Sequence, residues 1–169
     1  MNKPLSNEEI EQAIGPCVVL YSDLEKYPTI QNLLPRNGDY VVILVREKKN
    51  SGHWVLLYRK GLHHYVYFNS YGYKWDTQMK EVLSKEAIDT LNSQGDELTR
   101  LLKEQKVQYN KNKYQGATSA TCGRWVIFIV RMLKDDATFP KIQSLLKQIK
   151  KENGGSFDKN ILELTKDIV

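Results

Sequence analysis

Four residues of types that support acyl transfer follow one another along this chain of 169 residues: His53, Asn69, Gln115 and Cys122. A Cys thiolate is a strong nucleophile, a neighbouring His can accept and return its proton, and a third side chain can fix the imidazole tautomer. A Gln amide together with a backbone N–H can stabilise the oxyanion that forms at the attacked carbonyl. The set therefore predicts nucleophilic catalysis by Cys122.

The positions of these residues favour the same chemistry. His53 opens an apolar run after a Ser-Gly turn and Asn69 follows the next run, so a hairpin would bring the two side chains together. Cys122 opens an apolar helical segment, whose N-terminus carries roughly half a positive charge and stabilises a thiolate, more so beside an imidazolium. Gln115 precedes it across a loop of small residues, and Gly123 keeps bulk away from the thiolate.

The elements that must position these side chains indicate an α+β fold. Short β-branched and aromatic runs joined by turns predict an antiparallel meander at 40–45, 53–58 and 64–68, with a further strand at 107–109. Residues 17–21 are either a strand or a buried extended segment. Helices are expected at 7–14, 78–106 with a break at Gly95, 121–133, 138–151 and 157–168. The helix that begins at Cys122 is apolar nearly all round, so we expect it to lie centrally against an antiparallel or mixed sheet, flanked by the other helices.

Length and composition predict a single domain over residues 1–169. The formal charge of +5 is mildly basic. The first residues lack the apolar core of a secretory signal, and no apolar run approaches the roughly 20 residues of a membrane span. Cys17 and Cys122 are too few for a disulfide framework, and no ligand spacing predicts a metal site. We therefore expect a soluble protein of a reducing interior, with Cys17 as a core residue.

The order Gly-His53-Trp54, Asn69-Ser-Tyr-Gly72, Gln115 and Cys122-Gly123 resembles the adenovirus-type (adenain-like) cysteine endoproteases. More broadly, it resembles the ubiquitin-like-protein-specific proteases that share their fold. The resemblance covers about residues 40–133. Asn69 departs from the Asp or Glu of many members and is similar to the third residue of the Cys-His-Asn set in papain-like enzymes. The compact size, the basic surface and this Asn look most like maturation proteases of double-stranded DNA viruses and virophages.

This resemblance implies a cysteine endopeptidase that cleaves capsid or core precursors at small, Gly-containing sites, with Trp54 and Gly123 in the substrate cleft. It implies no required cofactor, although DNA or a peptide activates some relatives. The expected protein is a monomer of the virion and host-cell interior, in the cytoplasm, nucleus or viral factory, with viral precursors as partners and no membrane. Double-stranded DNA is a further candidate partner, for the basic residues Arg100, Lys103, Lys106, Lys111 and Lys113.

Other interpretations remain open from sequence. The same catalytic set would serve an isopeptidase that removes ubiquitin-like modifiers. A non-catalytic nucleic-acid-binding module would use the basic residues alone, and such runs are in most proteins simply solvated faces. Asp76 is the alternative to Asn69 for orienting His53, but it lies beyond Tyr73, past the end of the strand. A lone Cys at a buried helix is more often a core residue than a nucleophile. The assignment of Cys122 as the nucleophile therefore depends on the presence of His53, Asn69 and Gln115.

Overall fold

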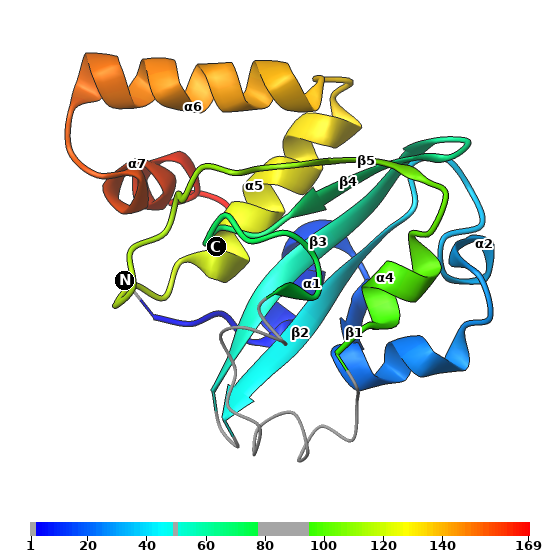
Figure 1. Ribbon diagram of the computed structural model, residues 1–169. Coiled ribbons are helices and arrows are strands. Elements are labelled where there is room, and N and C mark those ends of the chain that lie inside the picture. Colours follow the sequence, from blue (N-terminus) through cyan, green and yellow to red (C-terminus); the bar gives the residue numbers. More distant parts are fainter. Residues whose placement is uncertain (1–2, 49–50, 78–94) are drawn as a thin grey trace.

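A five-stranded mixed sheet forms the centre of the molecule in the computed structural model, which describes residues 3–48, 51–77 and 95–169 (Figure 1). Its strands lie side by side in chain order, as β1 (Val18–Leu20), β2 (Tyr40–Lys48), β3 (Ser51–Gly61), β4 (His64–Phe68) and β5 (Lys106–Tyr109). The three middle strands are antiparallel neighbours, which confirms the predicted meander. Strands β1 and β5 pair in parallel with β2 and β4, so the sheet is mixed and the α+β prediction is confirmed.

The three middle strands are buried on both faces, which explains why they are largely continuous apolar runs rather than alternating ones. Alternate residues of β3 enter two separate cores: Trp54 and Leu56 pack in one, and Val55 and Leu57 in the other. Helix α5 (Cys122–Lys134) fills the first core and is buried along nearly its whole length, as its composition predicts. His53 and Cys122 are therefore carried by buried elements, β3 and α5.

The remaining helices cover the two faces of the sheet. On the α5 side lie α1 (Asn7–Ile14), α6 (Phe139–Asn153) and α7 (Phe157–Leu164). On the other side lie the 3₁₀ helix η1 (Tyr21–Lys26) and the short helices α2 (Ile30–Leu33) and α4 (Glu97–Leu101). The helix expected over 78–106 falls partly on 78–94, outside the described residues, and its described end is α4, after Gly95.

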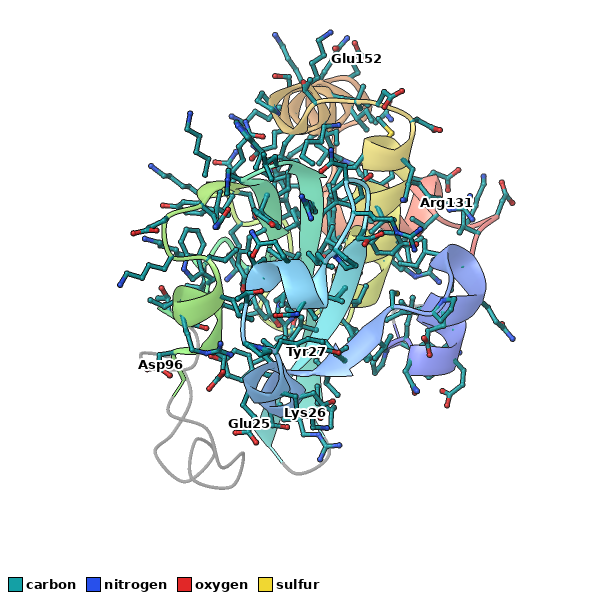
Figure 2. The ribbon with its side chains drawn as sticks, turned by 90° about the vertical axis from the view of Figure 1, so that its right-hand side faces the viewer. Glu25, Lys26, Tyr27, Asp96, Arg131 and Glu152 are labelled. Carbon is teal, nitrogen blue, oxygen red and sulfur yellow. The ribbon has the colours of Figure 1, made fainter. Side chains whose placement is uncertain are left out.

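Charged side chains project from the outer surfaces of these layers. Glu152 near the end of α6 points outward at one end of the molecule, and Glu25 and Lys26 of η1 do so at the other (Figure 2).

Helix α1 begins with a reciprocal capping box between Ser6 and Glu9. Within the described ranges, no helix combines the length and apolarity that crossing a bilayer would require.

Candidate active site

His53 and Asn69 are joined where β3 begins and β4 ends. The Nε2 atom of His53 lies 2.8 Å from Oδ1 of Asn69, and both side chains are buried. The last residue pair between the strands is Leu56 with Phe68, so Asn69 follows the paired segment and reaches back along β3 to His53. The contact inferred from the hairpin is therefore present, at a register that the sequence did not specify.

The orientation of the Asn69 amide fixes the tautomer of the imidazole. The same Oδ1 atom accepts the backbone N–H of Tyr71 at 2.9 Å, which identifies it as the oxygen of the amide. An oxygen only accepts hydrogen bonds, so Nε2 of His53 carries the proton that it donates to Asn69. The lone pair of the neutral ring is then on Nδ1. A base with its lone pair on a known atom is what proton abstraction from a thiol requires.

Burial holds His53 in the neutral form. It lowers the pKa of the imidazole from 6.5 to about 4, and the Asn69 hydrogen bond opposes this only in part. The ring of Tyr71 stacks on His53 with centroids 4.3 Å apart, which covers one face of the imidazole. This corrects one expectation from sequence: a neutral His53 does not supply the imidazolium that would stabilise a Cys122 thiolate. The N-terminus of α5 remains as the source of positive electrostatic potential at Cys122.

Asn110 fixes the backbone of Asn69 from the end of β5. Its Oδ1 accepts the Asn69 N–H at 3.2 Å, and its Nδ2 donates to the Asn69 carbonyl at 2.6 Å. The side-chain amide thus continues the sheet pairing by one position. Sequence reasoning missed this residue. The available signal was a lone Asn directly after a short strand, which is a common sequence in any turn.

Ser70 and Gln115 extend the hydrogen-bonded network toward the loop before Cys122. The hydroxyl of Ser70 donates to Oε1 of Gln115 at 2.6 Å, and Nε2 of Gln115 donates to the carbonyl of Ser119 at 2.7 Å. The backbone N–H groups of Tyr114 and Gln115 both bond to the carbonyl of Ser70. Because an amide nitrogen carries two protons, Nε2 of Gln115 retains a second donor for an incoming oxygen.

Cys122 begins α5 directly after this network. The hydroxyl oxygens of Ser119 and of Thr121, the N-cap residue, lie 3.1 Å apart, and both hydroxyls donate to Oδ1 of Asp158. Hydrogen bonds and the Asn69–Ser70 backbone therefore lead from His53 to the residue before Cys122. The rings of Phe68, which ends β4, and Trp125, in the first turn of α5, have centroids 6.3 Å apart. The structure therefore gathers the four predicted catalytic residues around the end of β4 and the start of α5. All four are buried, with exposed fractions between 0% and 6%.

Trp54 and Gly123, the expected cleft residues, both contact Leu5. The indole Nε1 of Trp54 donates to the Leu5 carbonyl at 3.0 Å. A Cβ added to Gly123 would lie 3.1 Å from Cβ of Leu5, so the missing side chain makes room for this residue of the N-terminal segment. Sequence reasoning assigned Gly123 to the space around the thiolate and did not anticipate Leu5. The segment before α1 thus packs against both expected cleft residues.

Asp76, the alternative partner of His53, belongs to a different network. It accepts the Tyr21 hydroxyl at 2.7 Å, the Thr99 N–H at 2.6 Å and the Thr99 hydroxyl at 2.7 Å. Burial raises its pKa, and these donors oppose the shift. Asp76 therefore ties η1 to the start of α4, and Asn69 is the side chain bonded to the imidazole.

The five basic candidates for DNA binding differ in what they contact. The guanidinium of Arg100 donates to the carbonyls of Leu24 and Tyr27 and pairs with Glu97 at 3.0 Å. Its contacts therefore hold α4 against η1. The four lysines are exposed: Lys103 precedes β5, Lys106 begins it, and Lys111 and Lys113 lie in the loop after it. These exposed lysines are accessible to a polyanion, whereas the guanidinium of Arg100 is engaged by the fold.

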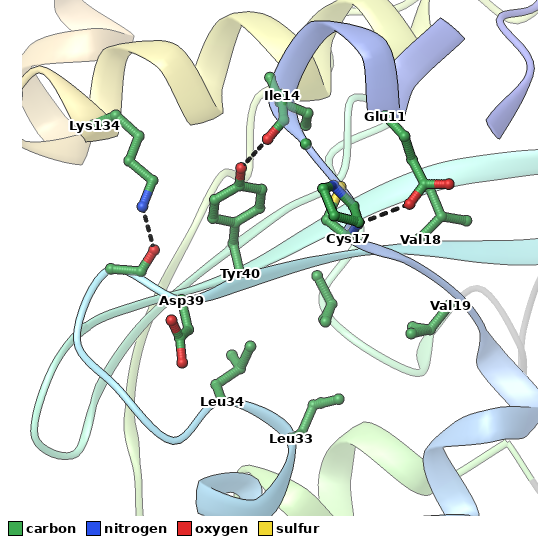
Figure 3. A pocket seen from close by; sticks show the side chains of 14 residues that line it. Glu11, Ile14, Cys17, Val18, Val19, Leu33, Leu34, Asp39, Tyr40 and Lys134 are labelled. Atoms are coloured by element: carbon green, nitrogen blue, oxygen red, sulfur yellow. Dashed lines mark hydrogen bonds between the residues drawn. The ribbon is translucent and has the colours of Figure 1, made fainter. Parts of the chain in front are cut away.

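Cys17 is a buried residue that lines a pocket, and its burial is as expected of a residue in an apolar run. This pocket of about 600 Å³ lies between α1, β1 and the start of β2, and shares no residue with the catalytic set (Figure 3). Burial and the nearby Glu11 carboxylate raise the pKa of the Cys17 thiol to about 12. The thiol is therefore protonated near neutral pH and unsuited to nucleophilic attack.

Comparisons with known proteins place the chain in a viral context. It is 35% identical over 113 residues to the uncharacterized protein V9 of Sputnik virophage, covering 65% of this chain and 64% of V9. The chain thus spans less than two thirds of the length of that relative. No family model matches the sequence. Among solved structures, the central domain of the uncharacterized Lpg1148 protein from Legionella pneumophila aligns over 98% of both chains, with a TM-score of 0.43 and 13% identity. The similarity to V9 shows that the chain has a viral homologue.

Proposed function

We propose that this protein is a cysteine endopeptidase that processes viral structural precursors. The single observation that carries the proposal is the hydrogen-bonded series from His53 through Asn69, then from Ser70 through Gln115 to Ser119, which lies three residues before Cys122. This series links the proposed base, orienting amide and oxyanion donor to the loop that precedes the proposed nucleophile. The virophage relative supports a viral role for such an enzyme.

The proposed reaction is acyl transfer through a thioester. Sγ of Cys122 attacks the scissile carbonyl carbon while its proton passes to Nδ1 of His53, the nitrogen opposite the Asn69 bond. The second Nε2 proton of Gln115 and the Cys122 backbone N–H stabilise the oxyanion. His53 then protonates the departing amine. Water finally attacks the thioester, again giving its proton to His53, and releases the acid product and the thiol.

The neutral state of His53 favours general-base catalysis over a resting ion pair. With a pKa near 4, the ring is unprotonated over the whole neutral range and is ready to accept the thiol proton. The imidazole of the resting protein is therefore neutral.

The test uses purified protein and internally quenched peptides that contain Gly-Gly or Gly-x-Gly, with cleavage sites read by mass spectrometry. Wild-type protein should cleave a subset, Cys122→Ala none, and Cys17→Ala, the matched thiol control, the same subset as wild type. A capsid precursor co-expressed with each variant gives the corresponding result on a whole protein. Equal processing by wild type and Cys122→Ala would sink the proposal. Labelling of Cys122 by ubiquitin or SUMO electrophilic probes, without peptide cleavage, would assign an isopeptidase instead.

A further inference from the structure

One carboxylate from α7 holds the loop that joins Gln115 to Cys122 at both of its ends. Oδ2 of Asp158 accepts the backbone N–H of Gly116 at 2.9 Å. Oδ1 of the same side chain accepts the hydroxyl of Ser119 at 2.8 Å and that of Thr121 at 2.6 Å. The loop thus begins and ends on a single side chain that lies 37 to 42 residues away in sequence.

The helix that carries Asp158 is itself fixed to the helix that carries Cys122. Asp158 is the second residue of α7, in the first turn, where the N-terminal end of a helix stabilises a negative charge. Farther along, the buried guanidinium of Arg124 donates to the Thr165 hydroxyl at 2.9 Å and to the Thr165 carbonyl at 3.4 Å. Arg124 belongs to the first turn of α5, which begins at Cys122. The Asp158 carboxylate and the Cys122 thiol therefore lie on two helices that these hydrogen bonds hold together.

The clamped loop sets the orientation of the Gln115 amide. The carbonyl of Ser119 accepts Nε2 of Gln115, and the hydroxyl of the same Ser119 is bound by Asp158. Movement of the loop would therefore rotate the donor that faces the oxyanion and shift the backbone at Thr121, next to the nucleophile. Displacements of about 1 Å at such groups can cost on the order of 100-fold in rate.

We propose that Asp158 is a positioning residue for the oxyanion site, acting through the 116–121 loop without touching substrate. This inference rests on the proposed function, since it assigns a role in the same reaction. It also assigns a task to α7, which the resemblance to known proteases left without one. The role is geometric: it needs hydrogen bonds at three places and does not need the negative charge.

The distinction between geometry and charge gives the test its variants. An Asn at position 158 is isosteric: its oxygen can accept the Gly116 N–H, and its NH₂ can donate to the hydroxyl oxygens of Ser119 and Thr121. Ala removes all three contacts. Gly116→Ala perturbs the same contact from the loop, because a Cβ there would lie 3.0 Å from Oδ2 of Asp158. Glu163→Ala, which removes an exposed carboxylate of the same helix, is the matched control.

Steady-state kinetics on the cleaved peptide should show a kcat about 10- to 100-fold lower for Asp158→Ala, with KM changed less than about threefold. Asp158→Asn should recover most of the lost kcat, and Glu163→Ala should match wild type. Hydrogen–deuterium exchange provides a readout independent of activity. Amides of residues 116–121 should exchange faster in Asp158→Ala than in wild type or Asp158→Asn, while the melting temperature of Asp158→Asn stays near that of wild type.

The outcomes separate this inference from the proposed function. A wild-type enzyme that cleaves peptides beside an equally active Asp158→Ala would overturn the positioning role and leave the protease intact. An Asp158→Asn as impaired as Asp158→Ala would show that charge matters, which also contradicts the role stated here. If wild type cleaves nothing, the proposed function fails. In that case unchanged loop exchange in Asp158→Ala still refutes the clamp.

Discussion

Oδ1 of Asn69 accepts the imidazole Nε2–H of His53 at 2.8 Å while it also accepts the backbone N–H of Tyr71. The second bond makes the first one informative, because it excludes the flipped amide in which NH₂ would face the ring. The imidazole therefore presents Nδ1 as its basic atom. A neutral amide achieves this without a carboxylate, which leaves the pKa of His53 low in its buried position.

Asn69→Asp should move the acid limb of the pH profile of kcat/KM upward. A carboxylate beside Nε2 stabilises the imidazolium and raises the pKa of His53. Since the base must be unprotonated, activity is lost as the pH falls through that pKa, near 4 in wild type and at least about one unit higher in the variant. Initial rates over the acid range measure the shift. An acid limb that does not move would argue against His53 as the base.

The pKa of His53 also predicts acid lability of the fold. The unfolded chain binds a proton on this imidazole below about pH 6.5, whereas the folded chain does so only near 4. Stability therefore falls as the pH drops through this window, by roughly 2 kcal/mol between pH 7 and about 4.5 from this residue. Urea unfolding of wild type and His53→Gln at the two pH values isolates the contribution. Asp76, whose pKa is raised, acts with the opposite sign in both proteins and cancels in the comparison.

Much of the fold and part of the site could be predicted because they depend on local patterns. The meander follows from consecutive β-branched runs and turns, and the contact of His53 with Asn69 needs only one hairpin, over 16 residues. The central position of α5 follows from its apolar surface. Such features are encoded within a few tens of residues.

The residues that hold the site in place could not be predicted in the same way. Ser70 meets Gln115 across 45 residues, Asn110 meets Asn69 across 41, and Leu5 meets Trp54 across 49. Each is a polar contact of one or two hydrogen bonds between distant segments, and no periodicity of the chain indicates which Asn, Ser or Leu will take part. The pairing of β1 and β5 with their parallel neighbours is likewise a long-range relationship, which short runs of apolar residues leave open.

Gly123 and Leu5 should show strong energetic coupling. Gly123→Ala places a Cβ 3.1 Å from Cβ and 3.2 Å from Cδ1 of Leu5, so it should destabilise the fold by about 1–2 kcal/mol although Ala is the better helix former. Leu5→Gly removes all the opposing atoms, and in that background Gly123→Ala should cost nothing. Urea unfolding of the four proteins in this cycle gives the coupling energy. Additive effects would mean that Leu5 does not pack on Gly123.

The exposed lysines along β5 predict salt-dependent binding to duplex DNA. Each phosphate contact releases counterions, so replacing Lys106, Lys111 and Lys113 with Ala should lower the slope of log affinity against log salt by about 2–3. Arg100→Ala should leave that slope unchanged and lower the melting temperature, because its guanidinium holds the carbonyls of Leu24 and Tyr27. Fluorescence anisotropy with a labelled duplex at several salt concentrations provides the measurement. A triple variant with the wild-type slope would assign these lysines to the ordinary solvated surface. A changed slope in Arg100→Ala would mean that Arg100 also contacts DNA.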